Sequence, residues 1–146
     1  FKYHPTREVG LAMTAEGLLM RQYLGAGRTD SALVAGADYL RTRLPKESQR
    51  DLYYWYYGTL TTFLHGGKVW DEWNEKMKPI FLEKQNEDGS WKAEGKRAKR
   101  EGTHVTTCWA ALSLTVYYRY LPIIHGYTRL NMGPQGGSLI PSPTGQ

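Results

Sequence analysis

Cysteine is almost absent from this chain: Cys108 is the single cysteine among 146 residues. One cysteine cannot form an intrachain disulfide, so the fold depends on its core, and the redox compartment stays open. The thiol lies in an apolar stretch with Val105, Trp109 and Leu112, and we expect it to be buried and inert. The sequence predicts no localisation.

Long hydrophobic runs are also missing. No apolar stretch reaches the roughly 18 residues that a membrane-spanning helix needs, and no basic, apolar and small-residue signal opens the chain. We therefore expect no membrane span in this segment. Because the sequence begins with Phe1 rather than Met, we also expect it to be processed or cut from a longer protein.

Positive charge is concentrated rather than spread. Much of the basic excess behind the net charge of +5 lies in one segment, which carries Lys92, Lys96, Arg97, Lys99 and Arg100. Such a cluster predicts a solvated loop; contact with phosphate, an acidic glycan or an anionic membrane is the alternative. No nucleic-acid-binding motif is present, so no nucleic acid partner is expected.

Helical periodicity, in contrast, is abundant, while strand patterns are nearly lacking. A hydrophobic content of 40% suits one globular domain with a core. Apolar residues recur at helical spacing and predict five helices, at about residues 7–24, 30–44, 49–65, 69–85 and 104–121. Pro79 is expected to kink or divide the fourth of these helices.

Amphipathic helices alternate with helices that are apolar on most sides. A helix that is apolar all round must be covered all round, so the first, third and fifth helices are predicted to lie inside and the second and fourth outside. The predicted fold class is all-α, with helix hairpins repeating over residues 1–125. Residues 126–146 are rich in glycine and proline and predict an extended tail.

The segment QNEDGSW, residues 85–91, closes the fourth predicted helix. Gln85 can bond to the helix end or to the next turn, Asp88 and Gly89 can reverse the chain, and Trp91 can pack back over the junction. The longer stretch FLEKQNEDGSW resembles the QW repeat of the terpenoid cyclase and protein prenyltransferase superfamily. With its flanking helices, it is similar to the bacterial prenyltransferase and squalene oxidase repeat proteins.

This resemblance implies an α/α toroid, in which inner and outer rings of helices surround a cavity. The chain supplies three inner helices, so a partial ring is expected. The acidic DxDD motif of the cyclases, the zinc-binding D-x-C pair of the prenyltransferases and the GCGEQ signature of related thioester domains do not occur. We therefore expect a non-catalytic helical repeat domain, a binding or assembly module of a larger protein.

Two enzyme hypotheses stand beside this one. The first is a terpenoid cyclase-like or prenyltransferase-like enzyme acting on a polyprenyl or other hydrophobic substrate, its acid or metal supplied by missing chain or a second subunit. The second is an α/α-barrel polysaccharide enzyme. That chemistry needs paired carboxylates, whereas Glu16 and Asp51 are isolated in the sequence.

Candidate site residues lie on the predicted inner helices. Tyr54, Tyr57, His104 and Trp109 are expected to line a cavity that suits a hydrophobic or peptide ligand, although core packing produces the same pattern. His104 and Cys108 are one helical turn apart and are weak zinc candidates; no metal or cofactor is predicted. Apolar edges on the first and fifth helices predict contact with other repeats or a homo-oligomer.

Overall fold

The computed structural model describes residues 1–2, 4–6, 8–116 and 118. It confirms the all-α fold class, since this part of the chain has helices and one isolated bridge, between Gln85 and Trp91, but no strand. The tail predicted for residues 126–146 lies outside the described residues. The helices are α1 (Leu11–Tyr23), α2 (Ser31–Arg41), α3 (Leu52–His65), α4 (Gly67–Glu83) and α5 (Lys96–Leu114), with a 3₁₀ turn at Glu47–Gln49.

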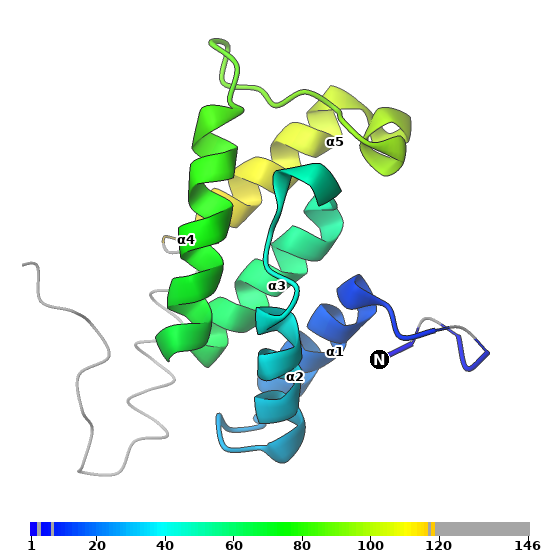
Figure 1. Cartoon of the computed structure of the whole chain (residues 1–146), viewed down its shortest axis with the longest axis vertical. Helices are drawn as coiled ribbons and strands as arrows, with labels where there is room; N and C mark the ends of the chain where they lie inside the picture. Colours follow the sequence, from blue (N-terminus) through cyan, green and yellow to red (C-terminus); the bar gives the residue numbers. More distant parts are fainter. Residues whose placement is uncertain (3, 7, 117, 119–146) are drawn as a thin grey trace, which may run out of the picture. The chain divides into compact units, whose positions relative to one another are not determined.

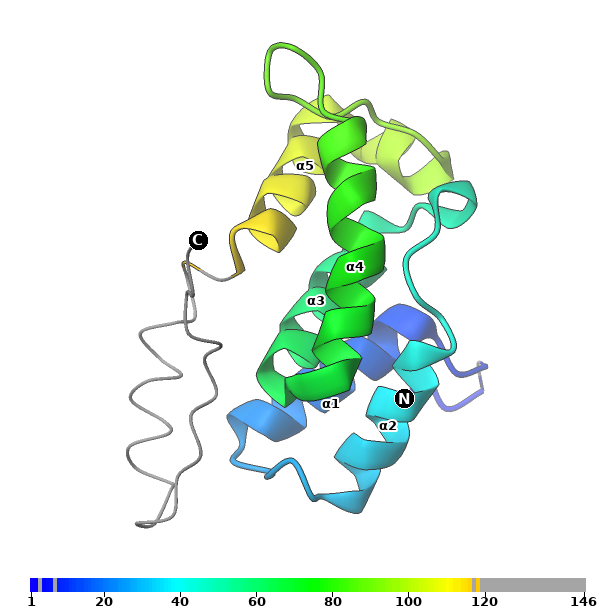
Figure 2. The same cartoon turned by 60° about the vertical axis from the view of Figure 1, so that its left-hand side comes forward.

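Helix α3 is the centre of the unit formed by residues 1–116. It packs against α1 on one side and α5 on the other, so that these three helices form one row (Figure 1). Helices α2 and α4 contact each other; α2 covers α1, and α4 lies over α3 (Figure 2). We call α1, α3 and α5 the inner row and α2 and α4 the outer row.

Aspartate caps fix the starts of two helices. The Asp30 side chain accepts a hydrogen bond from the Leu33 amide at 3.0 Å, and Asp51 accepts one from the Tyr54 amide at 3.2 Å. Each satisfies an amide that has no partner inside the helix. Helix α1 has no such cap, because Gly10 occupies the position, and it begins at Leu11 rather than near residue 7.

Two further boundaries differ from expectation. Helix α4 continues as one helix through Pro79, and the Pro79 side chain is exposed to solvent. Helix α5 begins at Lys96 rather than near residue 104, and Gly102, with φ 88°, breaks it into a short turn at 96–101 and a longer part. Part of the basic segment that was expected to be a loop is therefore helical.

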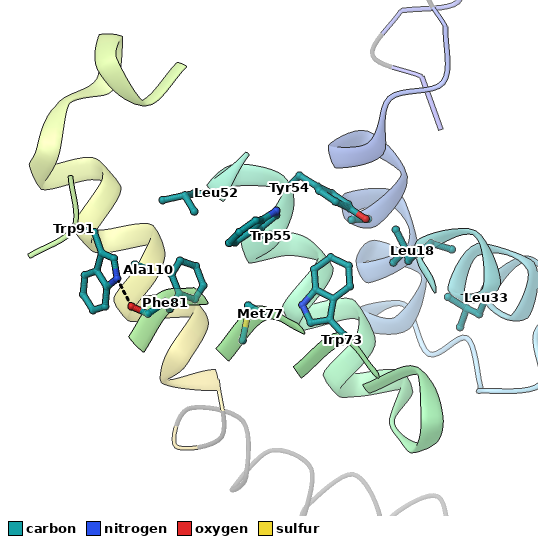
Figure 3. Close-up of a cluster of buried hydrophobic side chains, with 12 residues drawn as sticks. Leu18, Leu33, Leu52, Tyr54, Trp55, Trp73, Met77, Phe81, Trp91 and Ala110 are labelled. Atoms are coloured by element: carbon teal, nitrogen blue, oxygen red, sulfur yellow. Dashed lines mark hydrogen bonds between the residues drawn. The ribbon is translucent and has the colours of Figure 1, made fainter. Parts of the chain in front are cut away.

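The core lies between the two rows (Figure 3). Its largest fully buried side chains include Trp55, Trp73 and Phe81. The Trp73 indole donates to the Thr59 hydroxyl at 3.0 Å, which in turn donates to the Trp55 carbonyl at 2.7 Å. Helices α3 and α4 come close together at Gly58, where an added Cβ would lie 2.3 Å from the Trp73 ring.

Candidate functional site

The 85–91 turn follows α4 and reverses the chain over it. The Gln85 side-chain amide donates to the Gly89 carbonyl at 3.1 Å, and the Asp88 carboxylate accepts bonds from both the amide and the hydroxyl of Ser90, at 2.9 and 2.6 Å. Gly89 adopts φ 81°, which favours glycine. These bonds lie at the surface, and the two from Ser90, the hydroxyl bond first, lower the pKa of the Asp88 carboxyl.

Trp91 attaches this turn to the core. Its ring is 3% exposed and meets Phe81 edge-on at a centroid distance of 6.3 Å. The indole N–H donates to the Phe81 carbonyl at 2.8 Å (Figure 3). Phe81 belongs to the last turn of α4, where carbonyls lack helical donors. The Trp91 amide donates to the Thr107 hydroxyl at 3.1 Å, so the turn links α4 to α5.

A second group of aromatic residues lies along the inner row. Each ring of this aromatic cluster has its centroid 4.8 to 5.6 Å from its neighbours, distances typical of favourable aromatic pairs. Its members, from α3 and α5, are Tyr53, Tyr56, Tyr57 and Trp109. The cluster joins the central helix to α5 on the side away from the outer row's Trp73.

Helix α1 contributes a carboxylate to this cluster. The Tyr53 hydroxyl donates to Oε1 of Glu16 at 2.8 Å, while Oε2 of Glu16 is buried with no hydrogen-bond partner among the described residues. The indole nitrogen of Trp109 is also buried without a hydrogen-bond partner among the described residues. Burial, and then the bond to Glu16, raises the pKa of the Tyr53 hydroxyl, so the hydroxyl stays a protonated donor even in mildly basic solution.

The aromatic cluster borders a cavity of about 230 Å³, which we call the Tyr53 pocket. The Arg97 guanidinium lies 4.0 Å from the centre of the Tyr53 ring and donates from Nε to Glu101 at 2.8 Å. The pocket combines aromatic surface with charges of both signs. It is lined by Arg50, Asp51, Leu52, Tyr53, Arg97, Ala98, Glu101, Thr106 and Trp109.

The four residues predicted to line a cavity are placed apart. Trp109 borders the Tyr53 pocket and Tyr57 belongs to the aromatic cluster. Tyr54 is buried between the rows instead, with its ring 5.5 Å from that of Trp73 and its hydroxyl donating to the Arg43 carbonyl at 2.8 Å. His104 is exposed on α5 and does not line the pocket.

The zinc candidates gain no third ligand in the described structure. Cys108 is exposed, so the expectation that it is buried was wrong, because its stretch of α5 turns this face away from α3. In residues 1–2, 4–6, 8–116 and 118, no three His, Cys, Asp or Glu side chains lie together as a metal site would require. His104 and Cys108 therefore share an exposed helix face without a wider cluster.

The sequence did not predict that three residues of this site lie together. Glu16, Tyr53 and Arg97 lie far apart in the chain and meet when α1, α3 and the 96–101 turn pack together. The helical spacing of Tyr53 and Tyr57 places both on one face of α3 and could have predicted the aromatic part of the site. Nothing in the sequence pairs that face with Glu16.

Comparison of the chain with family models, curated proteins and solved structures finds no match. Within the described ranges, the helices are all too short or too polar to cross a bilayer.

Proposed function

We propose that this chain is a helical repeat module of the α/α toroid class that functions by assembling with the helix pairs of a second copy. The observation that carries this proposal is the open inner row. Among the described residues, helix α3 has an inner neighbour on each side, whereas α1 and α5 each have one and lie at the two ends of the row. Helix pairs stacked in this way bury their faces against the next repeat.

Near its C-terminal end, beyond Gly17 where the Phe1 ring covers the helix, α1 carries exposed apolar side chains. Met20 is 49% exposed and Leu24 is 88% exposed, and they are one helical turn apart. Val105, at the other end of the row, is 37% exposed. Neighbouring exposed apolar side chains are typical of interaction surfaces, so we assign the Met20 and Leu24 edge to contact with the next helix pair.

The 85–91 turn supports the same proposal. It resembles the QW repeat of the terpenoid cyclase and protein prenyltransferase superfamily, and in this chain it fastens the end of one helix pair to the helix that follows. The aromatic cluster gives the inner row a semi-polar wall that suits a bound ligand. The proposed module would therefore combine assembly at its ends with binding on its inner row.

Sedimentation velocity over a wide range of concentrations tests this assignment. We expect the chain to self-associate, and we expect the Met20→Lys, Leu24→Lys double variant to remain a monomer because two charges at the contact are costly to desolvate. Val34→Lys is the matched control: Val34 is 44% exposed, but it lies on α2 in the outer row. It should associate as the unaltered chain does.

Either of two results would overturn the proposal. The unaltered chain could sediment as a compact monomer at every concentration, which would leave the α1 edge without an assembly role. Alternatively, the purified chain could turn over a polyprenyl or squalene-like substrate, which would establish the enzyme hypothesis instead. In that case Glu16, the carboxylate held against the aromatic cluster, would be the first residue to substitute.

A further inference from the structure

The Tyr53 pocket already holds a cation, and the protein itself supplies it. The Arg97 guanidinium lies 4.0 Å from the Tyr53 ring centre, well inside the roughly 6 Å range of cation–π attraction. Glu101 accepts from Nε of Arg97 at 2.8 Å. A ring face and a carboxylate therefore recognise one guanidinium from two directions.

The rest of the pocket is suited to the same chemistry. Tyr53 and Trp109 meet at 85° with centroids 5.6 Å apart, so that two aromatic walls form a corner. Aromatic faces carry partial negative charge and attract cations. A second carboxylate, Asp51, lines the pocket and uses Oδ1 to cap α3. The Arg50 guanidinium is bound to Glu94 at 2.5 Å.

The position of Arg97 allows it to leave the corner. Its side chain is 45% exposed, so it lies at the mouth of the pocket rather than inside the core. Its departure needs only a rotation of its own side chain. The 96–101 turn also carries Glu101, which lines the pocket and is the carboxylate that a ligand would use.

We propose that the Tyr53 pocket binds the guanidinium group of a ligand in place of that of Arg97, whose partly exposed side chain swings out to solvent while the 96–101 turn keeps Glu101 at the pocket. A ligand guanidinium would stack on Tyr53 against Trp109 and donate to Glu101. Two sources present this group, a small guanidine and an arginine side chain of a protein partner. This inference rests on the proposed function, because it names the ligand class of the module's inner row.

The probe is ethylguanidinium, with ethylurea as a control of the same shape without the charge. Binding is followed in two-dimensional NMR by the indole N–H resonance of Trp109, assigned through its loss in Trp109→Phe. We expect a saturable shift with ethylguanidinium and none with ethylurea. The tripeptide Gly-Arg-Gly serves as a second probe: tighter binding of the tripeptide identifies an arginine side chain as the ligand, and weaker binding identifies a small guanidine.

Substitution of Arg97 tests the competition directly. Arg97→Ala should bind ethylguanidinium about tenfold more tightly, the factor expected when the internal guanidinium fills the corner for about nine-tenths of the time. Arg100→Ala, which removes the same charge from an exposed position of the same turn, should bind as the unaltered chain does. Glu101→Gln in the Arg97→Ala background should weaken binding again. If Arg97→Ala does not fold, Arg97→Gln keeps most of the stem and replaces it.

Equal shifts with ethylurea and ethylguanidinium would overturn the inference, because charge would then have no part in recognition. Unchanged affinity in both Arg97 variants would overturn it as well. Sedimentation of the same samples separates this outcome from failure of the proposed function. A chain that assembles through its α1 edge but binds no guanidinium refutes the ligand assignment alone, whereas a monomer that binds guanidinium refutes the assembly role alone.

Discussion

The end of α4 is stabilised chiefly by Trp91, and substitutions in the 85–91 turn should show this. Trp91→Phe keeps an aromatic ring but removes the N–H that donates to the Phe81 carbonyl at 2.8 Å. The lost bond and the buried carbonyl left without a donor should cost about 1–2 kcal/mol in the free energy of unfolding. Trp91→Ala also empties a site that is 3% exposed, and should cost about 3–5 kcal/mol.

Gln85→Ala is the matched substitution at the other end of the turn. Gln85 is exposed, and its side-chain amide donates to the Gly89 carbonyl at 3.1 Å. Water can replace this bond, so we expect a cost of about 0.5 kcal/mol. Its backbone pairing with Trp91 does not depend on the side chain and should persist.

Urea unfolding followed by circular dichroism measures all three values, and thermal unfolding offers a check at about 4 °C for each kcal/mol. The expected order of cost is Trp91→Ala, then Trp91→Phe, then Gln85→Ala. A larger loss from Gln85→Ala than from Trp91→Phe would refute the reasoning. It would mean that the surface bonds, rather than the buried indole, hold the end of α4.

Two further substitutions test the packing and charge of α3. Gly58→Ala should lower the free energy of unfolding by about 1–3 kcal/mol, because the new methyl meets the Trp73 ring at 2.3 Å; in a Trp73→Leu background the penalty should shrink, and an equal penalty in urea unfolding would contradict the clash. Burial, followed by the nearby Arg28, lowers the pKa of His65, against a smaller raising effect of Asp38. The unfolded state therefore takes up the proton first, so stability should be highest above about pH 6.5 and fall below it. His65→Gln should flatten this dependence in unfolding measured against pH, and an unchanged dependence in this variant would refute the assignment.

The helices could be predicted because their signals are local. Asp30 and Asp51 cap their own helices, and buried side chains recur at helical spacing, as Leu33, Ala37 and Leu40 do in α2. The start of α5 could not be predicted in this way. Charged residues fill the 96–101 turn, which therefore resembles a solvated loop, and Gly102 separates it from the apolar part of the helix.

The rotation of α3 about its axis was the harder quantity to predict. A helix that is apolar on most sides has no polar face to show which residues point outward. Tyr54 and Tyr57 were therefore grouped as cavity residues, yet Tyr54 packs on Trp73 in the outer row and Tyr57 joins the aromatic cluster. The partners that decide this, Glu16 and Trp73, belong to other helices, and their positions follow from tertiary packing.

This rotation also couples the core to the Tyr53 pocket. Tyr53 and Tyr54 are consecutive residues, so the packing of Tyr54 on Trp73 in the outer row fixes the direction in which Tyr53 points toward Glu16 and Arg97. Buried helices shift as units because interiors are close-packed. Gly58→Ala, which pushes α3 away from Trp73, should therefore disturb the bond between Tyr53 and Glu16 as well as the core. A variant that loses stability but keeps the Trp109 indole resonance in place would show that the two sides of α3 respond independently.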